Sequence, residues 1–239
     1  MKKVSIKIFL GICAAALIIM GIMLCPYFYI KTINITGNGI VSRDEILKIL
    51  ELSESNKTNL YAFNSYAGKE KLFKNPYIKS VEFTRTFPDT LEISIIERKP
   101  CGYIPYTNTF LFMDDEGRIL DSKSSYTTPL PVVYGLDFDT FTLGEKLNVE
   151  QPEKLNIVVE LSKLMKTYKI INDVVRVNVL NPDEIHLYVN KVDVVLGEFT
   201  DVNWKIGALS EIIKKLSPDD KGTLDITSPD KTPAFTYLT

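Results

Sequence analysis

The sequence predicts an α+β protein that begins with one N-terminal transmembrane helix, continues with a β-α-α-β-β module, and ends with a mostly antiparallel β domain with two helices. Three observations predict this class: an uncharged run near the N-terminus, two helical patterns between strand patterns, and short strands in the rest of the chain. The expected parts are a cytoplasmic tail (1–7), a transmembrane helix (8–29), the module (30–99), the β domain (100–227) and a C-terminal tail (228–239).

The transmembrane helix is predicted from residues 8–25, which contain no charged side chain and precede three aromatic residues at 27–29. At a rise of about 1.5 Å per residue, this segment spans a hydrocarbon core. The lysines before it place the N-terminus in the cytoplasm. A cleavable signal peptide is the alternative, but Ala14, Ala15 and Ala16 lie inside the apolar run rather than after it, which favours an uncleaved anchor.

The β-α-α-β-β module starts with a strand that places Ile33 and Ile35 on one face. Ser42 and Glu45 have the spacing of a capping box, so a helix follows, and a weaker helix is expected over 65–74. Because no flexible linker separates residues 8–29 from the first strand, the module is expected to sit directly on the membrane surface.

The module closes with a hairpin in the stretch VEFTRTFPDTLEISIIERKP, residues 81–100. Its apolar residues occupy odd positions on both sides of the turn, which requires a loop of odd length if they share a face. The simplest such loop, 88–90, pairs Phe87 with Leu91 and Phe83 with Ile95. Arg85 falls on the apolar parity, where its stem covers core and its head reaches solvent.

The β domain begins with a hairpin over 109–121, whose turn lies at 115–117, and a short strand over 132–135. A helix is expected over 152–168, with Pro152 in its first turn. Strands over 174–180, 184–190 and 192–199 and a helix over 202–216 follow. GTLDI (222–226) and AFTYL (234–238) read as final strand-like segments.

Few residues point to chemistry. The net charge of −2 gives no basic surface for nucleic acid. His186 is the only histidine, too few for the usual zinc sites, and Cys101 is the only cysteine after residue 29. Glycine-rich phosphate motifs are absent. We therefore expect no catalytic residue, no metal, no cofactor and no small-molecule substrate, and a protein that is not an enzyme.

Several motifs occur along the chain in an order that resembles one protein family. Five motifs follow a single anchor, namely INITGNGIVSRDEIL, NPYIKSVEFTRTFPDTLEISIIERKPCGYI, LFMDDEGRIL, LPVVYG and KGTLDI. Their order is typical of the FtsQ/DivIB family of bacterial cell-division proteins. The resemblance implies that 30–99 is a POTRA domain and 100–227 the family's β domain. It also implies a non-enzymatic divisome scaffold that binds FtsL-type and FtsB/DivIC-type coiled-coil partners at the septum and helps recruit and regulate septal peptidoglycan synthesis.

Carried onto this chain, the resemblance implies a partner-binding region formed by the helix 202–216 and the final strand region. Its candidate residues are Trp204, Leu209, Ile212, Ile213, Thr223, Leu224, Asp225 and Ile226. The expected mode is β-augmentation, in which a partner strand joins the sheet edge near 222–227. The alternative is that GTLDI is an internal strand covered by AFTYL. Thr227 stands where relatives often carry Arg, which puts a salt bridge there in doubt.

Two other functions compete with the scaffold function. A membrane-anchored POTRA chaperone would handle exported polypeptides in extended form. An anchored cell-wall hydrolase or transpeptidase lacks the catalytic groups that its chemistry needs.

Overall fold

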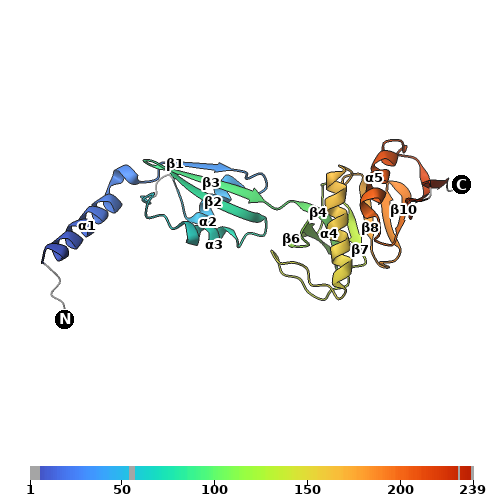
Figure 1. The fold of residues 1–239 in the computed structure, drawn as a ribbon, viewed down its shortest axis with the longest axis horizontal. Helices are drawn as coiled ribbons and strands as arrows, with labels where there is room; N and C mark the ends of the chain where they lie inside the picture. Colours follow the sequence, from blue (N-terminus) through green and yellow to red (C-terminus); the bar gives the residue numbers. More distant parts are fainter. Residues whose placement is uncertain (1–5, 54–56, 231, 238–239) are drawn as a thin grey trace. The chain divides into compact units, whose positions relative to one another are not determined.

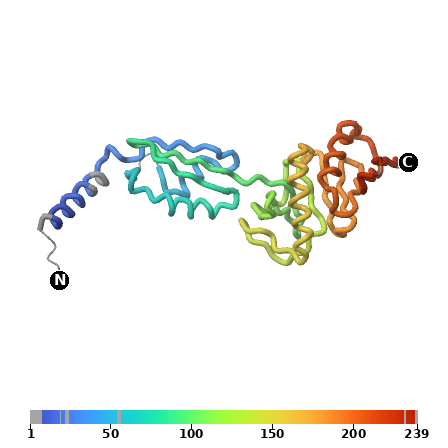
Figure 2. Tube along the Cα trace, viewed as in Figure 1, coloured from blue at the N-terminus to red at the C-terminus, as the bar shows by residue number. Residues whose placement is uncertain are grey.

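A computed structural model describes residues 6–53, 57–230 and 232–237. The chain divides into two compact units, Met1–Glu97 and Arg98–Thr239, and each is described by itself. In the tube trace the first unit runs from blue into green and the second from green to red (Figure 2). Both units combine helices with a β-sheet, so the predicted α+β class is confirmed.

The first unit contains the predicted β-α-α-β-β order (Figure 1). Its elements are α1 (Ile6–Leu24), the 3-10 helix η1 (Pro26–Phe28), β1 (Thr32–Thr36), α2 (Arg43–Leu50), α3 (Ser65–Leu72), β2 (Ile78–Thr86) and β3 (Thr90–Glu97). The sheet order is β1-β3-β2, with β1 parallel and β2 antiparallel to β3. Helices α2 and α3 cover one face of this sheet and enclose the core with it.

The predicted membrane segment overlaps α1, whose described large apolar side chains are exposed, Phe9 at 63% and Ile18 at 64% among them. Among the residues that the structure describes, no helix combines the length and the apolar character needed to cross a membrane. Residues 1–5 of the predicted cytoplasmic tail lie outside the described residues. The topology across a membrane therefore stays a prediction.

The predicted start of α2 is confirmed at Ser42. The Ser42 Oγ accepts a hydrogen bond of 3.2 Å from the backbone N–H of Glu45. The Glu45 carboxylate accepts a bond of 2.9 Å from the Asn75 side-chain amide, which ties the start of α2 to the turn after α3. Helix α3 is capped by Asn64, whose Oδ1 accepts from the N–H of Ala67.

The β2–β3 hairpin has an odd-length loop, as predicted, but its register is shifted. Phe83 pairs with Ile93 and Val81 with Ile95, so the odd apolar positions share one face. The loop is 87–89 rather than 88–90, and the predicted pairs Phe87–Leu91 and Phe83–Ile95 are wrong. Leu91 lies opposite Arg85, while Phe87 lies in the loop, 63% exposed, against aromatic rings from before the first strand.

Arg85 lies near the end of β2, where the sequence predicted it. Its guanidinium donates to the carbonyl oxygens of Leu60 (2.9 Å) and Phe63 (2.8 Å) and to the Ser65 Oγ (3.1 Å). Arg85 therefore fastens the segment before α3 to the sheet.

The second unit is built on one nine-stranded sheet of order β12-β11-β10-β9-β8-β7-β4-β5-β6. Its elements are β4 (Pro100–Tyr106), β5 (Thr109–Asp114), β6 (Ile119–Lys123), β7 (Val132–Tyr134), α4 (Pro152–Thr167), β8 (Val174–Asn178), β9 (Ile185–Val189), β10 (Lys191–Gly197), α5 (Val202–Ile213), β11 (Lys221–Asp225) and β12 (Ala234–Tyr237). Five neighbouring pairs are antiparallel and three are parallel, β4–β7, β7–β8 and β10–β11. The predicted mostly antiparallel sheet with two helices is therefore confirmed.

Helices α4 and α5 pack on the same face of this sheet (Figure 1). Buried side chains such as Leu161 on α4, Leu209 on α5 and Leu187 on β9 form one core between them. Strand β4, for which the sequence pattern predicted no separate strand, pairs with both β5 and β7. The sheet is thereby continuous from β6 to β12.

Candidate functional site

The predicted docking edge at 222–227 is occupied within the chain. Strand β11 pairs with β10 in parallel and with β12 in antiparallel fashion, with Leu224 opposite Val194 on one side and Phe235 on the other. A partner strand needs unpaired backbone groups along one side of a strand. The expectation of a free edge on β11 is therefore wrong, and the alternative, an internal strand covered by the AFTYL segment, is correct.

The pairing of β11 with β12 depends on Gly222. A Cβ atom placed on Gly222 would lie 2.2 Å from the backbone oxygen of Thr236 and 3.0 Å from the ring of Phe235. The first distance is far below van der Waals contact, and the obstacle is backbone, which cannot swing away. Glycine at this position therefore allows β12 to approach β11 closely.

Strand β12 is the terminal strand of the sheet. Its side chains are exposed or half-buried, and Tyr237 is 68% exposed. Phe235 packs against the core and contacts the Tyr237 ring edge to face, with centroids 4.6 Å apart. Because β12 pairs with β11 on one side only, its other side is the available edge at this end of the sheet.

Helix α5 is fixed to the end of β10 by a buried lysine. Lys205 is 1% exposed, and its ammonium donates two hydrogen bonds of 2.8 Å to the carbonyl oxygens of Leu196 and Glu198. Burial lowers the pKa of this ammonium, and the nearby carboxylates of Asp201 and Glu198 oppose the shift. These bonds satisfy a group that would otherwise be costly to bury, and they set the position of α5 on the sheet.

The predicted partner-binding residues separate into core and surface positions. Leu209, Leu224 and Ile226 are at most 2% exposed and belong to the core, while Ile212 and Ile213 are partly buried against it. Trp204 is 37% exposed, Thr223 is half-buried, and Asp225 is exposed, its carboxylate accepting a bond of 2.9 Å from the N–H of Thr227. The surface positions are the ones that a partner can reach without unfolding this unit.

The residues of β12 were absent from the predicted site. The sequence signal for them was the alternating AFTY segment directly after Pro233, which marks a short strand near the chain end. This pattern does not indicate that the strand pairs with β11.

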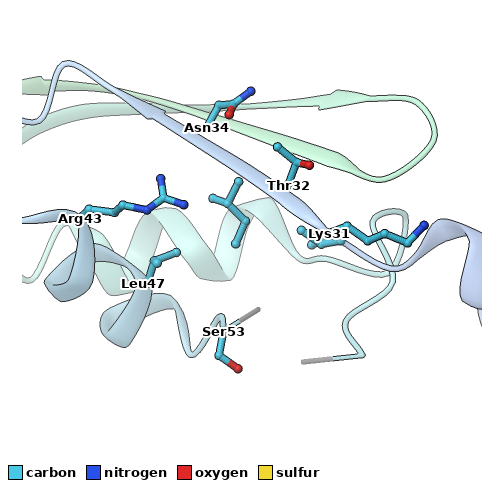
Figure 3. Close-up of a pocket in the computed structure, with 8 residues that line it drawn as sticks. Lys31, Thr32, Asn34, Arg43, Leu47 and Ser53 are labelled. Atoms are coloured by element: carbon cyan, nitrogen blue, oxygen red, sulfur yellow. The ribbon is translucent and has the colours of Figure 1, made fainter. Parts of the chain in front are cut away.

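A second free edge lies in the first unit, where β1 is a terminal strand of the three-stranded sheet. Next to it is a groove of about 310 Å³ between β1 and α2 (Figure 3). The lining residues are Ile30, Lys31, Thr32, Ile33, Asn34, Arg43, Leu47 and Ser53. Lys31 forms an ion pair of 3.1 Å with Asp89, whereas Arg43 has no ion pair with any residue in the described part of the chain.

Enzymes often use cysteine and histidine in catalysis, but the contacts of Cys101 and His186 are typical of residues that only support the fold. Burial raises the pKa of the Cys101 thiol to about 11, which keeps it protonated and unreactive at neutral pH. The His186 Nδ1 lies 2.8 Å from the Asp193 carboxylate, on the neighbouring strand β10. Within the described residues, no group of three or more His, Cys, Asp or Glu side chains is arranged to hold a metal ion.

A comparison with protein families matches residues 28–98 to the POTRA domain, FtsQ-type. These residues include every strand and both covering helices of the first unit's sheet. This match confirms the prediction that the first unit contains a POTRA domain.

Curated relatives match most of the chain. The cell division protein DivIB of Clostridium tetani is 25% identical over 192 residues, which cover 80% of this chain and 72% of the relative. DivIB of Clostridium botulinum (strain Hall) is 24% identical over 231 residues, 95% of this chain and 89% of the relative. The cell division protein FtsQ of Syntrophotalea carbinolica is 26% identical over 212 residues, 87% of this chain and 73% of the relative.

Among solved structures, the major extracytoplasmic domain of the trans isomer of DivIB from Geobacillus stearothermophilus aligns with 49% of this chain and 87% of that domain. The TM-score is 0.31 and the sequence identity 12%. The family match and the curated relatives together confirm the predicted resemblance to the FtsQ/DivIB family.

Proposed function

We propose that this chain, a relative of the DivIB and FtsQ cell-division proteins, is a non-enzymatic scaffold of the division machinery. It is anchored in the cell membrane by α1, with both folded units outside the cytoplasm at the septum. There it binds coiled-coil partners of the FtsL and FtsB/DivIC types and helps recruit and regulate septal peptidoglycan synthesis.

The observation that carries the binding part of this proposal is the free side of β12. A partner segment in extended conformation adds to β12 as a further strand, and backbone hydrogen bonds supply the affinity. The family resemblance points to residues 222–227 for this contact, but β12 covers that strand. The contact therefore moves one strand outward. Asp225, which is exposed and lies opposite Ala234 of β12, and Trp204, which is exposed on α5, are candidates for side-chain recognition.

The substitution Gly222→Ala tests the β12 contact. The added Cβ would lie 2.2 Å from the Thr236 backbone oxygen, so β12 must move away from β11, while Leu224 and Ile226 keep their places in the core. We expect co-purification of FtsL-type and FtsB/DivIC-type partners with the full chain to fall at least several-fold.

The matched control is Gly39→Ala, the same change in the first unit, where the added Cβ would lie 3.6 Å from the Glu97 side chain, an ordinary van der Waals contact. This variant should retain its partners. Recovery of partners with Gly222→Ala equal to that with Gly39→Ala, in protein whose circular dichroism shows the native fold, would contradict docking on β12.

The groove beside β1 favours a second candidate function, a membrane-anchored POTRA chaperone for exported polypeptides. An extended peptide would pair with β1, and the Arg43 guanidinium would attract an acidic side chain. Depletion separates the two functions in cells. Loss of a division scaffold should give filaments without septa and with normal secretion, whereas loss of a chaperone should give secretion defects in cells that divide normally.

A further inference from the structure

Four aromatic rings gather at one end of the first unit's sheet. Phe28 lies at the centre, with ring centroids 5.5 Å from Tyr27, 5.5 Å from Tyr61 and 6.0 Å from Phe87. Tyr27 and Phe87 also contact each other, at 6.0 Å. We call these four residues the aromatic patch. They come from three separate segments, η1, the segment before α3 and the β2–β3 loop.

Backbone hydrogen bonds hold the three segments together. The N–H of Leu60 donates to the carbonyl oxygen of Phe28 (2.8 Å), and the N–H of Ile30 donates to that of Thr58 (2.9 Å). The N–H of Lys31 donates to the Asp89 carbonyl (2.9 Å), and the Lys31 ammonium pairs with the Asp89 carboxylate. The patch is therefore a built part of the POTRA fold, and the residues after α1 are fixed to it.

The outer rings of the aromatic patch are open to their surroundings. Tyr27 is 54% exposed, Tyr61 46% and Phe87 63%. Single exposed apolar side chains are ordinary on a protein surface, but a contiguous aromatic cluster usually marks a contact surface. These three rings are joined through Phe28, so they form such a cluster.

The position of the aromatic patch along the chain indicates what covers it. Helix α1, with its exposed apolar side chains, ends at Leu24, three residues before Tyr27. Three residues span at most about 11 Å, so the Cα atom of Tyr27 lies within that distance of the end of the helix. Tyr and other aromatic rings with a polar tip concentrate where hydrocarbon gives way to lipid headgroups, because one end of the ring is apolar and the other is wet.

We propose that the aromatic patch inserts into the interfacial layer of the bilayer and seats the POTRA domain on the membrane surface. The inference rests on the proposed function in one respect, the anchoring of α1 in the membrane. It goes beyond that function because it assigns a second membrane contact to the folded domain itself, through the β2–β3 loop. Lys57 is exposed and directly precedes Thr58, whose carbonyl oxygen accepts from the N–H of Ile30, so it adds a positive charge that suits lipid phosphates.

Tryptophan fluorescence in brominated lipids tests the contact. Trp204 is the only tryptophan, so Trp204→Phe gives a background in which one new tryptophan reports alone. The full chain is reconstituted in vesicles with or without bromine on the lipid acyl chains. Phe87→Trp should show blue-shifted emission and be quenched by the brominated lipids.

Ile96→Trp is the matched control. Ile96 is 61% exposed on the same hairpin, but it lies six residues along β3 from Thr90, roughly 20 Å from the loop end at about 3.3 Å per residue. Its emission should resemble that of tryptophan in water. We expect quenching of Phe87→Trp to exceed that of Ile96→Trp several-fold.

Phe9→Trp, on α1, separates the inference from its premise. Quenching at residues 9 and 87 but not at 96 supports the proposal. Quenching at 9 without quenching at 87 overturns the interfacial contact and leaves the anchor standing. Absence of quenching at both 9 and 87 overturns the anchor and the interfacial contact together, quenching at 87 without quenching at 9 overturns the anchor alone, and equal quenching at 87 and 96 overturns the assignment of the contact to the aromatic patch.

Discussion

Glu97 holds the loop before α2 against the end of β3 in the POTRA domain. It is the last residue of β3, and its carboxylate accepts hydrogen bonds from three successive backbone N–H groups, those of Gly39 (2.8 Å), Ile40 (2.7 Å) and Val41 (2.8 Å). These amides lie directly before Ser42, the N-cap of α2. Glu97 thus fixes the entry into α2 from the far end of the central strand.

Replacing Glu97 with alanine should loosen this loop. The Glu97→Ala variant leaves three donors without their acceptor, and the Val41 N–H is partly buried, so we expect a loss of about 1–3 kcal/mol in the free energy of unfolding. Hydrogen exchange should accelerate at Gly39, Ile40 and Val41. Glu82→Ala, at an exposed glutamate of β2, is the control and should leave those amides protected. Unchanged protection in Glu97→Ala would show that water replaces the carboxylate without cost.

Residue-scale features differ in how far the sequence predicts them. The Ser42 cap of α2 is predictable because its partner, Glu45, is three positions away and the spacing itself carries the signal. The hydrogen bonds of Glu97 are not predictable from the sequence, because their partners lie 56 to 58 positions away. The burial of Lys205 is equally invisible, because its acceptors are backbone oxygens that have no residue type to recognise.

At the scale of elements, the β2–β3 hairpin shows what alternation alone decides. The odd positions of the apolar residues require an odd-length loop, and the structure has one. Parity does not choose between registers that differ by two residues. The register is instead the one that places Phe87 in the loop against Tyr27 and Phe28, residues that precede the first strand. The hairpin therefore depends on contacts with a distant segment, which a local pattern does not contain.

Strand pairing at the β12 end of the nine-stranded sheet also depends on contacts that a local pattern does not contain. GTLDI and AFTYL were both recognisable as strand-like, and both are strands. The sequence allows two alternatives for their pairing, because neither segment specifies its neighbour. Gly222 permits the observed pairing, since its lack of a side chain lets the Thr236 backbone come close. The candidate docking edge moved with that pairing, from β11 to β12.

At the scale of the whole molecule, each unit has a hydrophobic core of its own. Ile46, Leu91 and Ile93, all 0% exposed, belong to the core of the first unit, and Leu161 and Leu187, also 0% exposed, belong to that of the second. No residue is shared between the two described cores. A unit with a separate core is expected to unfold as its own cooperative transition.

Core substitutions in the two units should therefore act on different transitions. Ile93→Ala removes buried methyl and methylene groups from the central strand of the first unit, and Leu187→Ala does the same in β9 of the second, each at a cost of about 2–5 kcal/mol. In differential scanning calorimetry of the full chain, each variant should lower the midpoint of one transition and leave the other in place. The two variants are each other's control, because the removed volume is similar and only the core differs. A single transition lowered equally by both would show that the two cores melt as one cooperative unit.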